Sequence, residues 1–128
     1  MTGRGRQVIL VVEDDDSMRE AIETLLGAAG FSTMLYGSAE AMLTEEPIEL
    51  PLCIISDLKL PAMSGLDLLI ELRRRGRQEP VILITAYDTV SSRREAQRRG
   101  AAAYLTKPFP GAELLTAIHN ASSGARPQ

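Results

Sequence analysis

The sequence predicts an α/β fold in which helices cover both faces of a doubly wound, five-stranded parallel sheet. Two observations support this fold. Short, continuously apolar runs rich in β-branched residues are typical of strands buried on both faces, and they alternate with longer segments whose apolar residues recur every three or four positions. The connections between these segments are short, which favours right-handed β–α–β units.

Three of the five predicted strands are strongly apolar and are expected at the centre of the sheet. They cover residues 8–12, 52–55 and 80–84. Two weaker candidates, residues 31–36 and 101–105, each follow a glycine and are expected at the edges. The ligand site is expected beyond the carboxyl ends of these strands.

Five helices are predicted between and after the strands, each with its apolar residues gathered on one stripe. The segment 89–99 is the weakest of them, because beyond Val90 and Ala96 it consists of Ser, Arg, Glu and Gln. It is expected to be the least buried helix of the domain. The predicted helices cover residues 17–29, 38–44, 65–75, 89–99 and 110–121.

Two signals mark the beginning of the first helix. Ser17 followed by Glu20 has the form of a capping box, which predicts that the helix begins at Ser17. Asp15 and Asp16, which directly precede it, are interpreted as further caps of the same helix rather than as site residues. Both signals place an acidic segment at the amino end of this helix.

The composition limits the classes of function. A chain of 128 residues, 45% of them hydrophobic, fits one domain with its own core. A net charge of −3 argues against a surface that grips nucleic acid, so any DNA contact is expected to come from a separate domain. The longest apolar runs fall far short of the ~20 residues that a membrane span needs, and no membrane contact is expected. The lone cysteine, Cys53, favours a cytoplasmic location.

Three regions are expected along the chain. Residues 1–6 are predicted to be a disordered N-terminus and residues 7–121 to be the folded domain. Residues 122–128 are small, polar and contain proline, which is typical of a linker or a C-terminal tail.

Polar side chains gather at the carboxyl ends of four predicted strands. They are Glu13 and Asp14 after the first strand, Asp57 after the third, Thr85 after the fourth and Lys107 after the fifth. Carboxylates packed closely repel one another unless a cation holds them, and all-oxygen ligands suit Mg²⁺. A metal beside an aspartate, with a hydroxyl and an ammonium group opposite, is the arrangement that phosphoryl transfer to a carboxylate needs.

The chain resembles the receiver domains of two-component response regulators over nearly its whole length. The resemblance is carried by Val-Val-Glu-Asp-Asp-Asp at 11–16, Asp-Leu-Lys-Leu-Pro-Ala-Met-Ser-Gly at 57–65, Ile-Thr-Ala at 84–86 and Lys-Pro-Phe at 107–109. Among these domains the chain is most similar to the nitrogen-fixation regulator (FixJ-like) subfamily, in which a receiver precedes a helix-turn-helix domain. The resemblance implies a flavodoxin-like, CheY-like fold, with the strands in the order 2-1-3-4-5 across the sheet.

The resemblance also implies a role for each site residue. Asp57 is the expected phosphoacceptor, and Mg²⁺ is expected to bind Asp14 and Asp57 directly. Glu13 is expected to assist the metal largely through water, and the main-chain carbonyl of Lys59 to ligate it.

On the phosphoryl side, the resemblance implies contacts from Thr85 and Lys107, with the Lys107–Pro108 peptide bond in the cis form. Thr85 and Tyr104 are the expected switch residues, Tyr104 being the aromatic ring that moves. The implied domain is not an enzyme in its own right, but it assists its own phosphorylation and dephosphorylation.

Partners follow from the same resemblance. A sensor histidine kinase is the expected phosphoryl donor, and the expected output is control of transcription. The surface formed by residues 89–99, 101–105 and 110–121 is expected to change on phosphorylation. A homodimer through this surface is one expected arrangement.

The sequence departs from the family pattern at two places. Glu13 stands where aspartate is commoner, which lengthens the reach of that carboxylate to the metal. Arg94 and Gln97 stand at positions of the fourth helix where apolar residues facing the sheet are expected.

Two other classes of protein that share features of this fold do not fit the sequence. A haloacid-dehalogenase-type phosphatase needs a second aspartate two residues after the first, where this chain has Lys59. A flavodoxin needs a hydroxyl-rich phosphate loop after the first strand, where this chain has four acids. The alternative that stays open is a degenerate receiver, which keeps the fold and acts as a phosphorylation-independent interaction module.

Overall fold

The computed structural model describes residues 7–45 and 50–123, which form one five-stranded parallel sheet flanked by helices. The strand order is β2-β1-β3-β4-β5, and every neighbouring pair is parallel. This confirms the predicted order, with the two weaker strands at the edges. The strands are β1 (Val8–Val12), β2 (Ser32–Tyr36), β3 (Cys53–Asp57), β4 (Val81–Thr85) and β5 (Ala103–Thr106).

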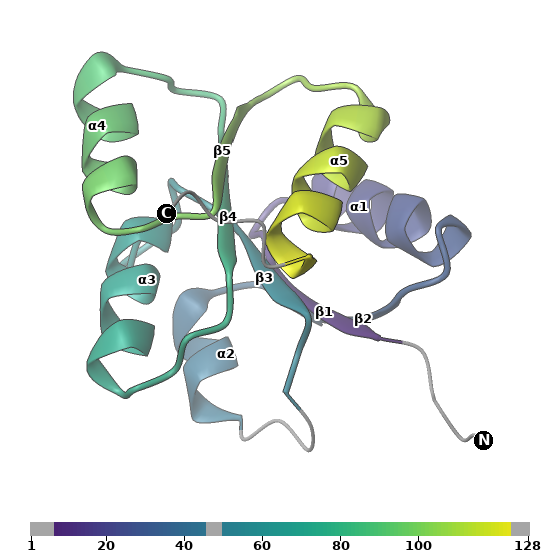
Figure 1. The fold of residues 1–128 in the computed structure, drawn as a ribbon, viewed down its shortest axis with the longest axis horizontal. Helices are drawn as coiled ribbons and strands as arrows, with labels where there is room; N and C mark the ends of the chain where they lie inside the picture. The colour runs from purple at the N-terminus through teal and green to yellow at the C-terminus, as the bar shows by residue number, and fades with distance from the viewer. Residues whose placement is uncertain (1–6, 46–49, 124–128) are drawn as a thin grey trace.

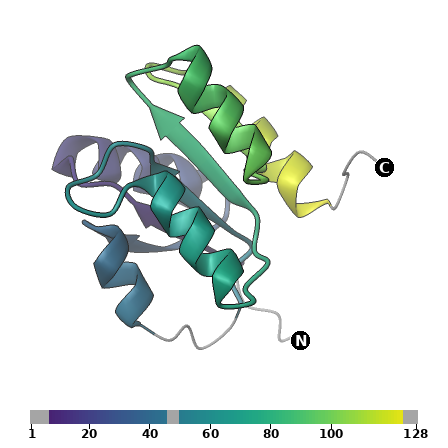
Figure 2. The ribbon, with the colours of Figure 1, turned by 90° about the vertical axis from the view of Figure 1, so that its left-hand side faces the viewer.

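Five helices cover the two faces of the sheet. Figure 1 shows α1 and α5 on one face and α2, α3 and α4 on the other. Figure 2 looks onto the second face, where α2, α3 and α4 lie side by side in front of the strands. The helices are α1 (Asp16–Ala28), α2 (Ala39–Thr44), α3 (Gly65–Arg74), α4 (Val90–Arg98) and α5 (Gly111–Ser122).

Two hydrophobic clusters fill the space between sheet and helices, one on each face. Alternate residues of a strand point to opposite faces, so Ile9 and Val11 join the cluster under α1 and α5, while Leu10 and Val12 join the cluster under α2 and α3. This explains why the central strands read as continuously apolar runs.

The start of α1 differs from the predicted capping box. Asp15 is the N-cap, its carboxylate accepts a hydrogen bond of 2.9 Å from the amide of Met18, and the helix begins at Asp16. The prediction that the helix begins at Ser17 was therefore wrong, and the reading of Asp15 as a cap is confirmed. Asp15 lies two residues before Ser17 in an unbroken acidic run. Its carboxylate accepts from a free amide of the first helical turn, as the Ser17 hydroxyl was expected to do, and its negative charge also interacts favourably with the positive end of the helix dipole.

The helix α4 has little contact with the core. Thr89 caps its amino end by accepting from the amide of Ser92, and Ala96 is its buried residue. The side chains of Arg94 and Gln97 are exposed, so the expectation that these two positions face the sheet was wrong. Because no apolar stripe fixes the rotation of α4 about its own axis, the small Ala96 turns inward instead.

The two expected terminal regions fall largely outside this description. Residues 1–6 and 124–128 lie outside the described residues, so the predicted disordered N-terminus and most of the predicted tail are untested. The end of α5 at Ser122 agrees with the expected end of the last helix to within one residue. Within the described ranges, no helix is both long enough and apolar enough to cross a membrane.

Candidate functional site

The register of the sheet brings the carboxyl ends of four strands to one level. Val12 of β1 pairs with Ser56 of β3, Asp57 pairs with Ile84 of β4, and Thr85 pairs with Thr106 of β5. The residues that directly follow these pairs are therefore held at one edge of the sheet. The structure brings four of the predicted site residues together here: Glu13, Asp14, Asp57 and Lys107.

Lys107 joins two buried carboxylates. Its Nζ donates to Oδ2 of Asp57 at 2.8 Å and to Oε1 of Glu13 at 3.0 Å. Burial alone lowers the pKa of Lys107, but the two carboxylates outweigh it and hold the pKa above its ordinary value. For Glu13 burial wins over the hydrogen bond from Lys107, so the pKa of this carboxyl group is raised. The ammonium group thus neutralises part of the charge crowded at the strand ends.

The three carboxylates at this edge fit a divalent ion. Glu13, Asp14 and Asp57 each offer an oxygen, and these oxygens lie within 4.8 Å of one another. Glu13 and Asp57 are buried, whereas Asp14 is exposed and opens the cluster to solvent. An all-oxygen donor set with one open side suits a hard cation that keeps part of its water shell, and Mg²⁺ is such a cation.

The backbone around Asp57 fixes its carboxylate. The amide of Lys59 donates to Oδ1 at 3.1 Å, so the two carboxylate oxygens have different donors, Lys59 and Lys107. Gly65 packs against the main chain of Asp57 so closely that a Cβ added there would lie 2.3 Å from the Asp57 carbonyl oxygen. This close approach brings the start of α3 against the carboxyl end of β3.

Thr85 is fully buried at the end of β4, and its backbone and side chain are both engaged. Its Oγ1 accepts a hydrogen bond of 2.9 Å from the amide of Tyr87, and its carbonyl accepts one of 2.7 Å from the amide of Lys107. The second bond ties the loop that carries Lys107 to β4. The following peptide bond, Lys107–Pro108, is cis, as expected.

Tyr104 lies on β5, opposite Leu83 of β4 and two residues before Thr106. Its hydroxyl is buried and has no hydrogen-bond partner among the described residues. Burial and the nearby carboxylate of Asp88 raise the pKa of this phenol. Arg93 of α4 covers the ring, with Cζ 4.6 Å from the ring centroid.

Three contacts at the site were missed by the sequence reasoning. Arg19 donates a hydrogen bond of 2.8 Å to the carbonyl of Glu13 and so braces the acidic turn from α1. Gly65 closes against Asp57, as described above. The ammonium group of Lys59 lies over the ring of Tyr87, 5.5 Å from its centroid. The eight-residue spacing from Asp57 to Gly65 was a signal for the second contact, whereas the first and third depend on side-chain directions.

A buried carboxylate with its lone pairs held in place, beside an ammonium group and further acids, can act as a nucleophile towards phosphorus. Comparison with known proteins agrees with this chemistry. The sequence profile of the response regulator receiver domain family matches residues 9–119. The chain is therefore a member of the response regulator receiver family.

Individual relatives and solved structures agree with this assignment. Nodulation protein W of Bradyrhizobium diazoefficiens is 36% identical over 113 residues, covering 88% of this chain and 50% of that protein. The transcriptional regulatory protein FixJ of Azorhizobium caulinodans is 39% identical over 109 residues, covering 84% of this chain and 51% of that protein. The crystal structure of full-length FixJ from B. japonicum superposes with a TM-score of 0.86 at 31% identity, covering 97% of this chain and 61% of that one.

This chain thus spans about half the length of the curated relatives it matches. The predicted family, and the resemblance to the FixJ group, are confirmed by these matches.

Proposed function

We propose that this domain takes a phosphoryl group onto Asp57 from a phosphohistidine of a sensor kinase. A carboxylate oxygen of Asp57 attacks phosphorus, the phosphorus–nitrogen bond breaks, and the electron pair returns to the imidazole ring. The observation that carries this proposal is the buried ion pair between Asp57 and Lys107, at 2.8 Å. Lys107 balances the charge of the carboxylate through this ion pair and would lie where charge develops on the phosphoryl oxygens.

The proposed metal ligands are the carboxylates of Asp14 and Asp57, with Glu13 acting through water and the main-chain carbonyl of Lys59 completing the protein set. Mg²⁺ bound there would neutralise charge on the transferred group. The clustered oxygens of Glu13, Asp14 and Asp57 support this assignment. Arg19, through the Glu13 carbonyl, holds the acidic turn in place.

Thr85 and Lys107 are proposed to contact the phosphoryl group, and Thr85 and Tyr104 to transmit the change to the α4–β5–α5 surface. The domain would thus assist its own phosphorylation and dephosphorylation without turning over a separate substrate.

Residues 7–121 are proposed as the receiver unit, acting in the cytoplasm. Because the relatives that are transcriptional regulators extend beyond the matched region, we propose that the output is transcription and that DNA is contacted by a separate domain. A homodimer through the same surface is proposed as one output arrangement.

The test is the mass of the protein after incubation with acetyl phosphate and Mg²⁺. We expect a gain of one phosphoryl group in the wild type and none in Asp57→Asn. Glu23→Gln is the matched control, since Glu23 is an exposed carboxylate of α1 outside the cluster of Glu13, Asp14 and Asp57. A folded wild-type protein that gains no phosphoryl group from acetyl phosphate or from histidine kinases would instead be a degenerate receiver.

A further inference from the structure

The loop between β3 and α3 contains a strained residue. Ala62 has a φ of 63°, and among the described residues it is the only one other than glycine with a positive φ. In this left-handed region the Cβ atom crowds a carbonyl oxygen of the backbone, so the conformation persists only where surrounding contacts hold it. The contacts that hold Ala62 therefore have a consequence for the loop as a whole.

The two ends of this loop are fixed by the main chain and by the core. The amide of Gly65 donates to the carbonyl of Leu58 at 3.0 Å and so closes the loop on itself. The side chains of Leu58 and Leu60 are buried in the hydrophobic cluster under α2 and α3. Pro61 and Ala62, by contrast, are exposed, so packing of its own side chain does not hold Ala62 in its strained conformation.

A side chain from another helix holds the segment instead. Oε2 of Glu40, in the first turn of α2, accepts a hydrogen bond of 3.1 Å from the amide of Met63, the residue directly after Ala62. The carboxyl end of α2 is tied to the end of α3 as well, since the carbonyl of Leu43 accepts from Arg75 at 3.3 Å. The helix α2 is therefore fixed at both ends against the segment that follows β3.

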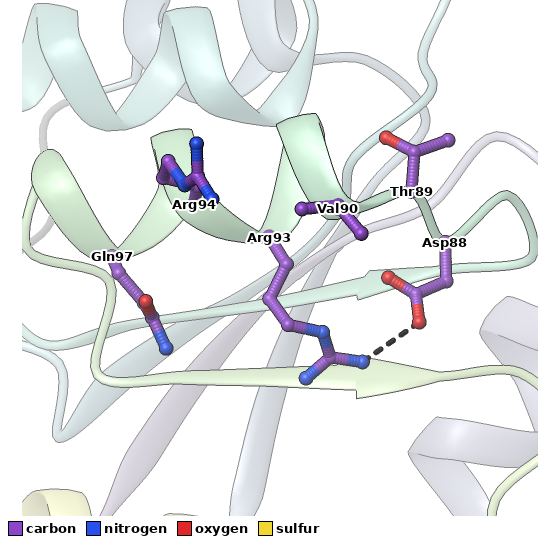
Figure 3. A pocket seen from close by; sticks show the side chains of 6 residues that line it. All are labelled: Asp88, Thr89, Val90, Arg93, Arg94 and Gln97. Atoms are coloured by element: carbon purple, nitrogen blue, oxygen red, sulfur yellow. Dashed lines mark hydrogen bonds and ion pairs between the residues drawn. The ribbon is translucent and has the colours of Figure 1, made fainter.

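The bond from Met63 to Glu40 differs in its span from most polar contacts of the exposed surface. Figure 3 shows a contact of the ordinary kind in the groove beside α4, where Arg93 pairs with Asp88, five residues earlier in the chain. Such a pair stabilises one segment locally. Glu40 and Met63 are 23 residues apart, so their bond fixes the position of one segment relative to another.

We propose that Glu40 is a positioning residue for the metal site. The loop that it fastens also carries Lys59, whose amide donates to Asp57 and whose main-chain carbonyl is a proposed Mg²⁺ ligand. Relaxation of Ala62 to a negative φ would change the path of this loop and with it the direction of the Lys59 carbonyl. The apparent affinity for Mg²⁺ then falls with the fraction of molecules that keep the strained loop. The inference rests on the proposed function and adds a contribution from α2 to it.

The test is calorimetric titration of the unphosphorylated 128-residue chain with Mg²⁺. Glu40→Ala should lower the affinity roughly two- to fivefold, the upper figure being the loss of one ordinary hydrogen bond. Glu40→Gln keeps a carbonyl acceptor without the charge, so its affinity should lie between those of wild type and Glu40→Ala. Glu23→Ala is the matched control, because Glu23 is an exposed carboxylate of α1 outside the metal cluster, and it should leave the affinity nearly unchanged.

A second substitution separates the strain at Ala62 from the charge of Glu40. Glycine adopts a positive φ without steric cost, so Ala62→Gly should restore most of the affinity that Glu40→Ala loses. Exchange of the Met63 amide hydrogen, measured without Mg²⁺, should be faster in Glu40→Ala than in Glu40→Gln. A contact that served only overall stability would change urea unfolding and leave the Mg²⁺ affinity of the folded protein unchanged.

Equal Mg²⁺ affinity of wild type and Glu40→Ala, or a loss that Ala62→Gly does not restore, would overturn the inference and leave the proposed metal site in place. Unchanged exchange of the Met63 amide in Glu40→Ala would overturn it too, because the bond would then not hold the loop. A wild-type chain that binds no Mg²⁺ would overturn the proposed metal site and this inference with it.

Discussion

The guanidinium group of Arg93 lies over the ring of Tyr104, with Cζ 4.6 Å from the ring centroid. The same side chain pairs with Asp88 at 2.8 Å and reaches Oγ1 of Thr106 at 3.4 Å. It therefore spans the gap between α4 and β5 and closes over a phenol whose hydroxyl is buried. One residue of the proposed output surface thus holds the residue that is proposed to switch.

We expect Arg93→Ala to release the Tyr104 ring. Burial is the main reason why the pKa of Tyr104 is raised, so a released ring should ionise nearer to its ordinary value. A ring that stays in place would ionise at still higher pH, because the positive charge of Arg93 lowers this pKa. Absorbance titration in a Tyr36→Phe/Tyr87→Phe background shows in which direction the pKa of Tyr104 changes. In Arg93→Lys this pKa should lie between its values in wild type and in Arg93→Ala, since lysine keeps the charge and loses the planar contact.

Asp14→Asn should weaken Mg²⁺ binding by about tenfold or more, because it removes the exposed charged ligand of the cluster. Calorimetric titration measures this affinity directly. Glu23→Gln, in α1, removes an exposed carboxylate outside the cluster and should leave the affinity nearly unchanged. If the two variants bound Mg²⁺ equally well, Asp14 would not be a ligand.

Gly65→Ala should destabilise the fold and disturb Asp57. The added Cβ would lie 2.3 Å from the carbonyl oxygen of Asp57 and 3.0 Å from Oγ of Ser56, and a main-chain atom cannot move away without shifting β3 or α3. We expect a loss of about 2 kcal/mol in the free energy of unfolding, together with slower phosphorylation.

Gly27→Ala is the matched control for this substitution. Gly27 lies inside α1 and an added Cβ meets nothing within 4 Å, so this change should stabilise the protein by up to about 1 kcal/mol. Urea unfolding of both variants separates the close contact at Gly65 from any general effect of replacing a glycine.

The phosphorylated state should be long-lived because Lys59 and Tyr87 together shield it. Nζ of Lys59 lies 5.5 Å from the centroid of the Tyr87 ring, so the two side chains lie against each other beside Asp57 and Thr85. A water molecule attacking the acyl phosphate in line would have to pass both. Loss of the phosphoryl group in Mg²⁺ should therefore be faster in Lys59→Ala/Tyr87→Ala than in wild type. Equal or slower loss would remove the shielding argument.

Tyr36→Phe should change how stability depends on alkaline pH. The hydroxyl of Tyr36 donates to Oε1 of Glu45 at 2.8 Å, and burial together with this bond raises the pKa of Tyr36 from 10.0 to about 12. A pKa raised by folding means that the neutral phenol stabilises the folded state below pH 10, and that this contribution is lost as the pH rises from 10 to 12. The variant should be about 1 kcal/mol less stable near pH 8, where the hydrogen bond is intact in wild type.

Above pH 10 the difference in the free energy of unfolding between wild type and Tyr36→Phe should narrow, because only wild type has a phenol to ionise at this position. Unfolding in urea at several pH values measures this difference. Tyr87→Phe is the control, since the side chain of Tyr87 is 66% exposed and its loss should leave stability unchanged. Parallel stability curves for wild type and Tyr36→Phe would contradict the assigned pKa.

Much of the fold and the membership of the site could be predicted from the sequence. Continuous apolar runs mark strands that are covered on both faces, and the parallel arrangement then aligns their carboxyl ends. For this reason Asp57 and Lys107, 50 residues apart in the chain, were expected at one place, and their side chains meet at 2.8 Å. The weak apolar pattern of residues 89–99 likewise predicted a helix with little buried surface, and Ala96 is its buried residue.

The remaining features depend on information that a pattern of residue types does not carry. With a polar α4, no apolar stripe fixes which side faces the sheet, so the sequence could not tell whether Arg93 or Arg94 would cover the Tyr104 ring. Four acids in a row give several equivalent caps, and the pattern alone does not single out Asp15, which caps α1. The ion pair between Glu13 and Lys107 depends on the extra methylene of glutamate, which lets its carboxylate reach the ammonium group at 3.0 Å.

Among the described residues, α4 buries a single side chain, that of Ala96, which sets the apolar part of the energy of any rearrangement there. Taking the methyl group of Ala96 out of the core costs on the order of 1 kcal/mol. For α3, displacement would expose the buried side chains of Leu68, Leu69 and Leu72, at roughly 2 kcal/mol each. A bias of about 1.4 kcal/mol changes the ratio of two populations tenfold. A change of charge at Asp57 equivalent to one good ion pair is therefore similar in size to the apolar cost of moving α4, and much smaller than the apolar cost of moving α3.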